Sequence, residues 1–163
     1  MTMILEILIS CLIFTIIAGG MTYFRPLSMI NNYPKPIQDK VKKLGLIKDE
    51  QTSTSKKTFI KKIIALILLV VILSFVVHKY NDADTFFKGF IYSYIIWTSV
   101  NWCDALLIDC IWFCHSKRVI IQGTEGMKEY KDYWFHIKGA LKGMLYGLPA
   151  CLLVGLIVLI FKN

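Results

Sequence analysis

Long runs of apolar residues alternate with polar connections along this chain. The runs cover about residues 3–24, 59–77, 86–114 and 139–161. Each is long enough to supply the roughly 20 residues that an α-helix needs to cross a bilayer. The pattern therefore predicts an all-α integral membrane protein, built as a single domain of four transmembrane helices.

The connections between the runs differ in charge. Basic residues gather in two loops, at about 25–58 and 115–138, whereas the short connection after the second run carries Asp82 and Asp84. Loops rich in lysine and arginine stay on the cytoplasmic side of a membrane. We therefore expect both basic loops inside and both termini outside, in a multi-pass protein of the plasma membrane.

The composition supports this class and argues against nucleic-acid binding. Hydrophobic residues make up 56% of the 163 residues, charged residues make up 18%, and the net charge is +8. A soluble domain is about 45–50% apolar and about 25% charged. The basic residues flank apolar runs and do not cover a soluble face, so we expect them to attract anionic membrane lipid.

Two segments of the basic loops have the pattern of short amphipathic helices on the cytoplasmic side. The first begins near Pro36 and stops at Gly45, with Ile37, Val41 and Leu44 on one face. Lysines surround the rest of this segment. The pattern is typical of an interfacial helix that lies on the membrane surface.

The second amphipathic segment is predicted to start at Glu125, with Thr124 as its cap. Four polar residues then share one stripe: Glu125, Glu129, Asp132 and His136. In one interpretation the acids face water and the opposite aromatic face lies at headgroup depth. In the other, Asp132 and His136 lie one turn apart and act together as metal ligands or as an acid/base pair.

The third run is unusual because polar and ionisable residues interrupt it. Asn101, Asp104 and Asp109 lie in its second half, and His115 follows its end. An ionisable group inside the bilayer costs about 2.5–3.5 kcal/mol, so it is by default a functional-site hypothesis. In a regular α-helix Asp109 lies about 120 to 160° from Asp104, which predicts two polar flanks on a buried, central helix.

The fourth run repeats a small residue at every fourth position: Gly139, Gly143, Gly147, Cys151 and Gly155. Small residues at this spacing let membrane helices approach closely. The stripe has the pattern of a glycine zipper and predicts close helix packing. One arrangement that it allows is a homodimer through the four glycines.

The predicted topology brings acids, imidazoles and cations to the cytoplasmic end of the bundle. The candidate catalytic residues are Asp104, Asp109, His115, Asp132 and His136. The candidates for binding a substrate headgroup are Arg25, Asn101, Lys117 and Arg118. Carboxylates with one or two histidines also suit a divalent metal ion, for which Asp132 and His136 are the candidate ligands.

The sequence is compatible with three functions. The first is a membrane-embedded enzyme that acts on a lipid or isoprenoid substrate at the cytoplasmic face, in one version with a metal ion. The second is a small oligomeric transporter or channel with Asp104 as its ion or proton site. The third is an accessory subunit whose Asp104 and Asp109 pair with cations of a larger membrane complex.

Overall fold

The computed structural model describes residues 3–47 and 56–161. Within these ranges, four helices are long and apolar enough to cross a membrane: Met3–Phe24, Phe59–Asn81, Phe86–His115 and Tyr133–Phe161. Each apolar run predicted from the sequence falls inside one of them. The all-helical architecture with four candidate spans is therefore confirmed, while residues 48–55 of the first predicted loop lie outside the described residues.

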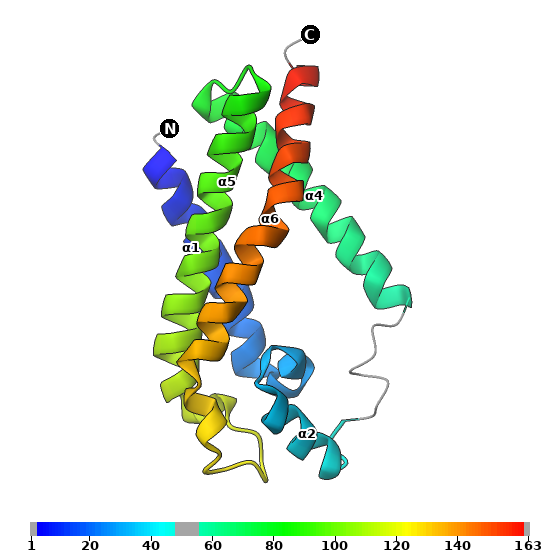
Figure 1. Cartoon of the computed structure of the whole chain (residues 1–163), viewed down its shortest axis with the longest axis vertical. Coiled ribbons are helices and arrows are strands. Elements are labelled where there is room, and N and C mark those ends of the chain that lie inside the picture. The colour runs from blue at the N-terminus through cyan, green and yellow to red at the C-terminus, as the bar shows by residue number, and fades with distance from the viewer. Residues whose placement is uncertain (1–2, 48–55, 162–163) are drawn as a thin grey trace.

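The spans and their connections run from the N-terminus to the C-terminus in Figure 1. The elements of the spans are α1 (Met3–Phe24), α4 (Lys56–Asn81), α5 (Phe86–Cys103), the π-helix η2 (Asp104–Trp112), the short 3₁₀ helix η3 (Phe113–His115) and α6 (Tyr133–Phe161). The connecting elements are η1 (Pro26–Asn32), α2 (Lys35–Lys43), η4 (Lys117–Val119) and η5 (Lys128–Lys131). All four connecting elements lie at one end of the molecule, which we call the loop end.

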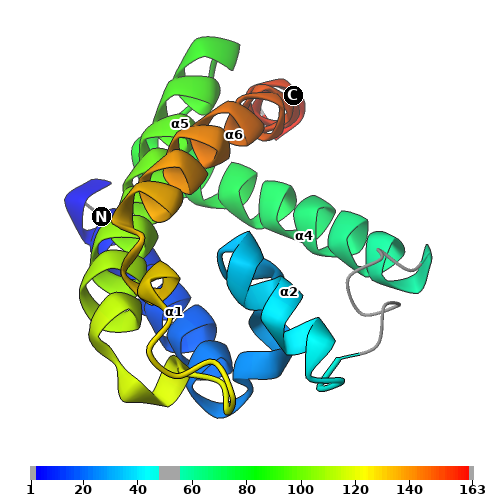
Figure 2. The same cartoon turned by 60° about the horizontal axis from the view of Figure 1, so that its bottom comes forward.

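The second span packs differently from the other three. Val70, Ser74 and Val77 of α4 are buried, whereas residues 59–69 are all exposed. Figures 1 and 2 show the reason. The C-terminal part of α4 crosses α6, whereas the N-terminal part of α4 diverges from the bundle toward the loop end. The apolar half of α4 that diverges therefore packs less against the other described residues than the C-terminal half of α4 does.

The closest helix pair is formed by α5 and α6, which run side by side in both views (Figures 1 and 2). Gly143 and Gly147 of the predicted stripe face the side chains of Asn101 and Trp97, and Gly155 packs against the start of α5. The Trp97 indole N–H donates to the Gly143 carbonyl at 3.0 Å. These glycines therefore bring two helices of one chain together.

The first predicted amphipathic helix is present as α2, and the chain turns after it at Gly45, whose φ is +69°. Its Ile37 and Val41 are fully buried in a core cluster that includes Tyr33 and Phe113. Ile37 and Val41 therefore face the protein and not a membrane surface, contrary to the expectation, whereas Leu44 of the same predicted face is 43% exposed. α2 thus belongs to a small folded cap over the loop end.

The second predicted amphipathic helix, from Glu125 onward, is wrong. Gly123 and Gly126 have φ values of +85° and +77°, a left-handed conformation that a continuous right-handed helix does not contain. The Thr124 hydroxyl does not cap a helix, because it donates to the Ile121 carbonyl at 2.6 Å. The segment is therefore a turn followed by the short helix η5.

Helix α6 begins at Tyr133, earlier than the predicted start near residue 139. The Asp132 carboxylate accepts a hydrogen bond from the Phe135 backbone N–H at 2.9 Å, which is the geometry of a helix N-cap. Because of this earlier start, His136 is the fourth residue of α6. This early start places His136 in the molecule's interior.

Candidate functional site: a polar cavity near the loop end

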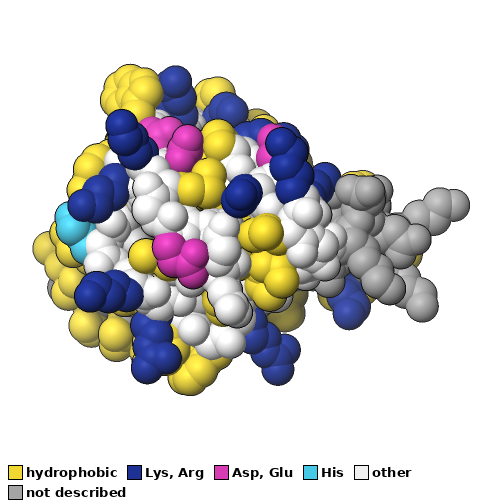
Figure 3. All heavy atoms as spheres, turned by 90° about the horizontal axis from the view of Figure 1, so that it is seen from below, with side chains coloured by type: hydrophobic (Ala, Val, Ile, Leu, Met, Phe, Trp, Pro, Cys, Tyr) yellow, Lys and Arg dark blue, Asp and Glu magenta, His cyan; other side chains and the backbone are white. Residues whose placement is uncertain are grey.

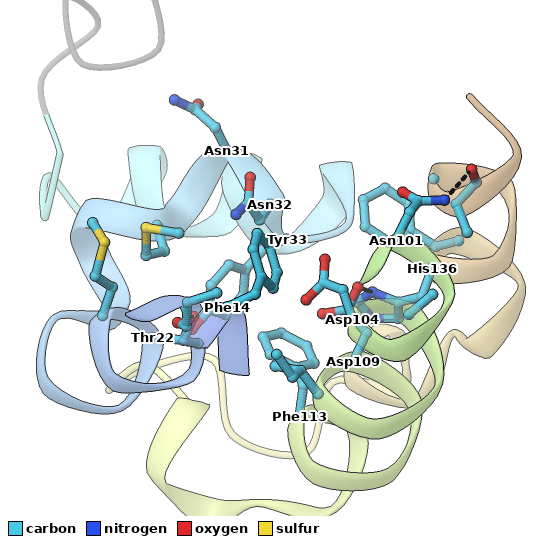
Figure 4. A pocket seen from close by; sticks show the side chains of 18 of the residues that line it. Phe14, Thr22, Asn31, Asn32, Tyr33, Asn101, Asp104, Asp109, Phe113 and His136 are labelled. Atoms are coloured by element: carbon cyan, nitrogen blue, oxygen red, sulfur yellow. Dashed lines mark hydrogen bonds and ion pairs between the residues drawn. The ribbon is translucent and has the colours of Figure 1, made fainter. Parts of the chain in front are cut away.

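A cavity of about 530 Å³ lies between α1, the segment that follows α1, η2 and the first turns of α6. Much of its wall is apolar, with Phe14, Ile17 and Met21 from α1. The polar residues that line it are Thr22, Asn31, Asn32, Tyr33, Asn101, Asp104, Asp109 and His136. Figure 4 shows these side chains from close by. The cavity thus combines an apolar wall with a polar, acidic one.

Asp109 and His136 meet at this cavity. The Nδ1 atom of His136 lies 3.0 Å from Oδ2 of Asp109, and the two side chains are 2% and 31% exposed. A carboxylate oxygen accepts hydrogen bonds, so Nδ1 of His136 is the donor in this contact. Nε2 is buried and has no hydrogen-bond partner among the described residues. Asp109 therefore orients an imidazole whose second nitrogen is uncommitted.

Two aromatic rings enclose this imidazole. The ring centroids of Phe113 and Phe135 both lie 5.2 Å from that of His136. Phe113 belongs to the third span and Phe135 to α6, so each helix supplies one ring. These contacts contribute to the burial of the imidazole, whose side chain is 2% exposed.

Asp104 lines the same cavity because the third span changes its winding. From Asp104 to Trp112 the chain is a π-helix, in which each hydrogen bond spans five residues. Residues five apart then lie over one another, so Asp109 comes round to the side of Asp104. The prediction of two separate polar flanks is wrong for this reason, and Figure 4 shows both carboxylates at one place.

The Asp104 carboxylate forms no hydrogen bond or ion pair within residues 3–47 and 56–161. One turn earlier, the Asn101 side chain donates to the Ala140 carbonyl of α6 at 2.8 Å. Asn101 thus positions the two helices beside the cavity, while Asp104 remains available to a bound molecule. Both residues line the cavity as part of the third span.

His115 and Asp132 do not line the cavity. His115 is exposed, its Nδ1 is 2.9 Å from the Ile111 carbonyl, and its Nε2 is 3.2 Å from the Tyr133 hydroxyl. The Asp132 carboxylate is used as the cap of α6. Among the described residues, no three His, Cys, Asp or Glu side chains come together as ligands for a metal ion. The suggested pairing of Asp132 with His136 is therefore replaced by the pairing of Asp109 with His136.

The predicted headgroup-binding cations also lie elsewhere. Arg25, Lys117 and Arg118 are exposed, and the Arg118 guanidinium lies 5.4 Å from the centroid of the Tyr23 ring. No lysine or arginine is among the residues that line the cavity. With two carboxylates and amide side chains, this lining suits a hydroxyl, amide or ammonium group better than a phosphate.

The segment after α1 also contributes to the cavity, which was not predicted from the sequence. Asn31, Asn32 and Tyr33 line the cavity next to Thr22 of α1. Gln38 donates to the Tyr33 carbonyl at 2.7 Å and so ties this segment to α2. A signal was present in the sequence, because two asparagines stand directly before Tyr33 and the proline that precedes α2.

No family model, curated protein or solved structure matches this chain. The function is therefore inferred from the chain's own residues and their geometry.

Proposed function

We propose that this chain is a membrane-embedded enzyme that acts on a lipid or isoprenoid molecule with a hydroxyl, amide or ammonium group at its polar end. His136 exchanges a proton with that group, Asp109 orients His136, and Asp104 contacts the substrate from the same side. One observation carries the proposal. It is the contact between half-buried Asp109 and buried His136, whose Nε2 is uncommitted, at a cavity that Asp104 also lines.

The chemistry of this pair suits proton transfer. Imidazole is the side chain that gains and loses a proton near neutral pH, and it is the most frequent general acid or base in enzymes. A carboxylate on Nδ1 fixes the tautomer and stabilises the imidazolium when Nε2 takes up a proton. Asp109 fulfils both conditions for His136.

The walls of the cavity indicate where the rest of the substrate lies. Phe14, Ile17 and Met21 of α1 present apolar side chains opposite the acidic residues. An acyl or isoprenoid chain along α1 would place its polar end among Asp104, Asp109 and Asn32. This orientation matches the usual design of ligand pockets, which are mostly apolar with a few convergent polar groups.

Substitutions of two histidines, His136 in the cavity and His115 outside it, test the proposal. Full-length protein is reconstituted in vesicles made from a total lipid extract of the expression host, and the lipids are compared by mass spectrometry before and after incubation. His136→Gln is expected to lower product formation by about 100-fold or more. His115→Gln, outside the cavity, is expected to stay within about twofold of wild type. Wild-type product formation by His136→Gln would contradict the proposal.

A second function is favoured by Asp104. Two carboxylates line a cavity without lysine or arginine, and the carboxylate of Asp104 has no hydrogen-bond partner in the described part of the chain. Such a site also suits a cation or a proton, as in an ion-coupled transporter. In that case His136 and Asp109 hold the site together and Asp104 binds the coupling ion.

A further inference from the structure

A second pocket, of about 460 Å³, lies at the loop end of the molecule. Its inner wall is formed by the buried residues Phe113, Cys114 and Tyr130. The exposed residues on it include three lysines: Lys117, Lys128 and Lys131. These lysines come from η4 and η5, so the fold of the loop brings them together.

The positive charges of the lysines that line this basic pocket have no acidic partner among the other lining residues. No aspartate or glutamate lines it. Within the described residues, Lys117, Lys128 and Lys131 form no ion pair with a carboxylate. Like charges that face one hollow repel each other and raise the local concentration of anions. An anion in this pocket would lie beside three lysines, and no acidic residue lines the pocket.

The wall behind the lysines is held in place by buried hydrogen bonds. The Tyr130 hydroxyl accepts a hydrogen bond from the Ile121 backbone N–H at 3.0 Å and lies 2.7 Å from the Thr124 hydroxyl. The Tyr33 hydroxyl donates to the Val119 carbonyl at 3.0 Å, which ties the loop to the segment before α2. The pocket is therefore built on an ordered framework, which lowers the cost of ordering its lysines around a ligand.

The pocket lies at the end of the candidate membrane spans, where lipid headgroups would be expected. Figure 3 shows lysine and arginine side chains distributed around the loop end, with fewer acidic ones among them. Tyr23, Tyr133 and Trp134 are exposed near the same end of α1 and α6. Exposed aromatic residues of this kind mark the interface between a membrane and water. A phosphate at this depth can come from a lipid headgroup or from a soluble compound.

We propose that the basic pocket binds a phosphate-bearing anion through Lys117, Lys128 and Lys131. The inference goes beyond the proposed function and does not rest on it, because it uses a different pocket and different residues. Basic pockets at the cytoplasmic ends of membrane helices recognise anionic headgroups by the same chemistry. The predicted topology places this pocket on that side.

The test measures lipid binding by the full-length protein in detergent with native mass spectrometry. The probes are phosphatidylglycerol, which is anionic, and phosphatidylcholine, which has no net charge, each with and without inorganic phosphate as competitor. A variant with Lys117→Gln, Lys128→Gln and Lys131→Gln is expected to bind phosphatidylglycerol about tenfold more weakly or worse. Competition by inorganic phosphate would assign the site to a soluble phosphate compound, and its absence to a lipid headgroup.

The matched control removes three exposed lysines that lie outside the pocket, by Lys40→Gln, Lys43→Gln and Lys138→Gln. It loses the same charge, so it corrects for diffuse attraction between a basic surface and an anionic lipid. The control is expected to stay within about twofold of wild type. Equal weakening in both triple variants, or equal binding of the two lipids by wild type, overturns the proposal. Lys131→Glu provides an independent variant, and unchanged phosphatidylglycerol binding by it would also overturn the site.

Discussion

His136 of α6 and Asp109 of the π-helix η2 are joined at 3.0 Å, in a place that the periodicity of a regular α-helix does not predict. Each group gains a partner, which would offset part of the cost of an ionisable side chain in a candidate membrane span. The same contact orients the imidazole at the cavity. Structural support and the proposed chemistry therefore depend on one pair of residues.

Asp104→Asn is expected to increase stability and to lower activity. Asp104 and Asp109 line one cavity, so removing one negative charge relieves repulsion and raises the free energy of unfolding by up to about 1 kcal/mol. Product formation in the lipid assay should fall by about tenfold or more, because the substrate loses a charged partner. Thermal unfolding in detergent and the vesicle assay measure the two effects on the same preparation.

The same variant separates the two proposed functions. If the protein is an enzyme, Asp104→Asn loses product formation. If it is a transporter, Asp104→Asn loses ion-coupled flux into proteoliposomes, and neither wild type nor the variant forms a product. If Asp104→Asn retained both wild-type product formation and wild-type flux, neither role of Asp104 would stand. Asp39→Asn is a suitable control, since Asp39 lies on α2 and is exposed.

Asp132 is expected to affect stability and not catalysis. Asp132→Ala removes the carboxylate that caps α6, which costs about 1 kcal/mol and lowers the melting temperature by about 2–4 °C. Asp132→Asn keeps an oxygen that accepts the hydrogen bond and should melt like wild type. Loss of activity in Asp132→Asn, with an unchanged melting temperature, would show that Asp132 has a catalytic or metal-binding role.

Two glycines of α6 should respond differently to alanine. A Cβ atom at Gly147 would collide with the Trp97 indole, whereas a Cβ atom at Gly139 meets nothing within 4 Å. Overpacking of a tight contact costs about 1–3 kcal/mol, so Gly147→Ala should lower the melting temperature by about 3–10 °C. Gly139→Ala should leave it unchanged or raise it, because alanine favours the helix by up to about 1 kcal/mol. Equal effects would show that the stripe does not pack against α5.

The topology prediction is tested by labelling single cysteines in intact cells. In a cysteine-free variant, Asp82→Cys in the connection between α4 and α5 should react with an impermeant maleimide, because that connection is predicted to lie outside. Lys40→Cys on α2 should react only after the membrane is permeabilised, because the basic loops stay inside. The reverse pattern would invert the topology.

The spans could be predicted from sequence because length and hydropathy decide them. A run of about 20 apolar residues has few alternatives to a helix, and each predicted run lies within an observed helix. The ends of the helices were harder to predict from the sequence. The start of α6 depends on Asp132 as its cap and on Gly123 and Gly126, whose left-handed conformations end any helix begun at Glu125.

The site could be predicted only in part. Asp104, Asp109 and His136 were all candidates, because ionisable residues near membrane spans are costly and therefore informative. Their grouping could not be predicted from the sequence, because it depends on a π-helix that brings Asp109 beside Asp104. Asn32 and Tyr33 were missed because their Asn-Asn-Tyr-Pro sequence marks a turn but does not show that the segment folds back against the spans.

The pairing of Asp109 with His136 can be measured most directly by ¹⁵N NMR of the histidine side chains in detergent micelles. The chain has three histidines, so His78→Gln, His115→Gln and His136→Gln assign every signal. We predict one Nδ1–H proton that exchanges slowly with water, disappears in His136→Gln and changes its chemical shift in Asp109→Asn. An Nδ1 signal of His136 that exchanges rapidly and does not respond to Asp109→Asn would contradict the account.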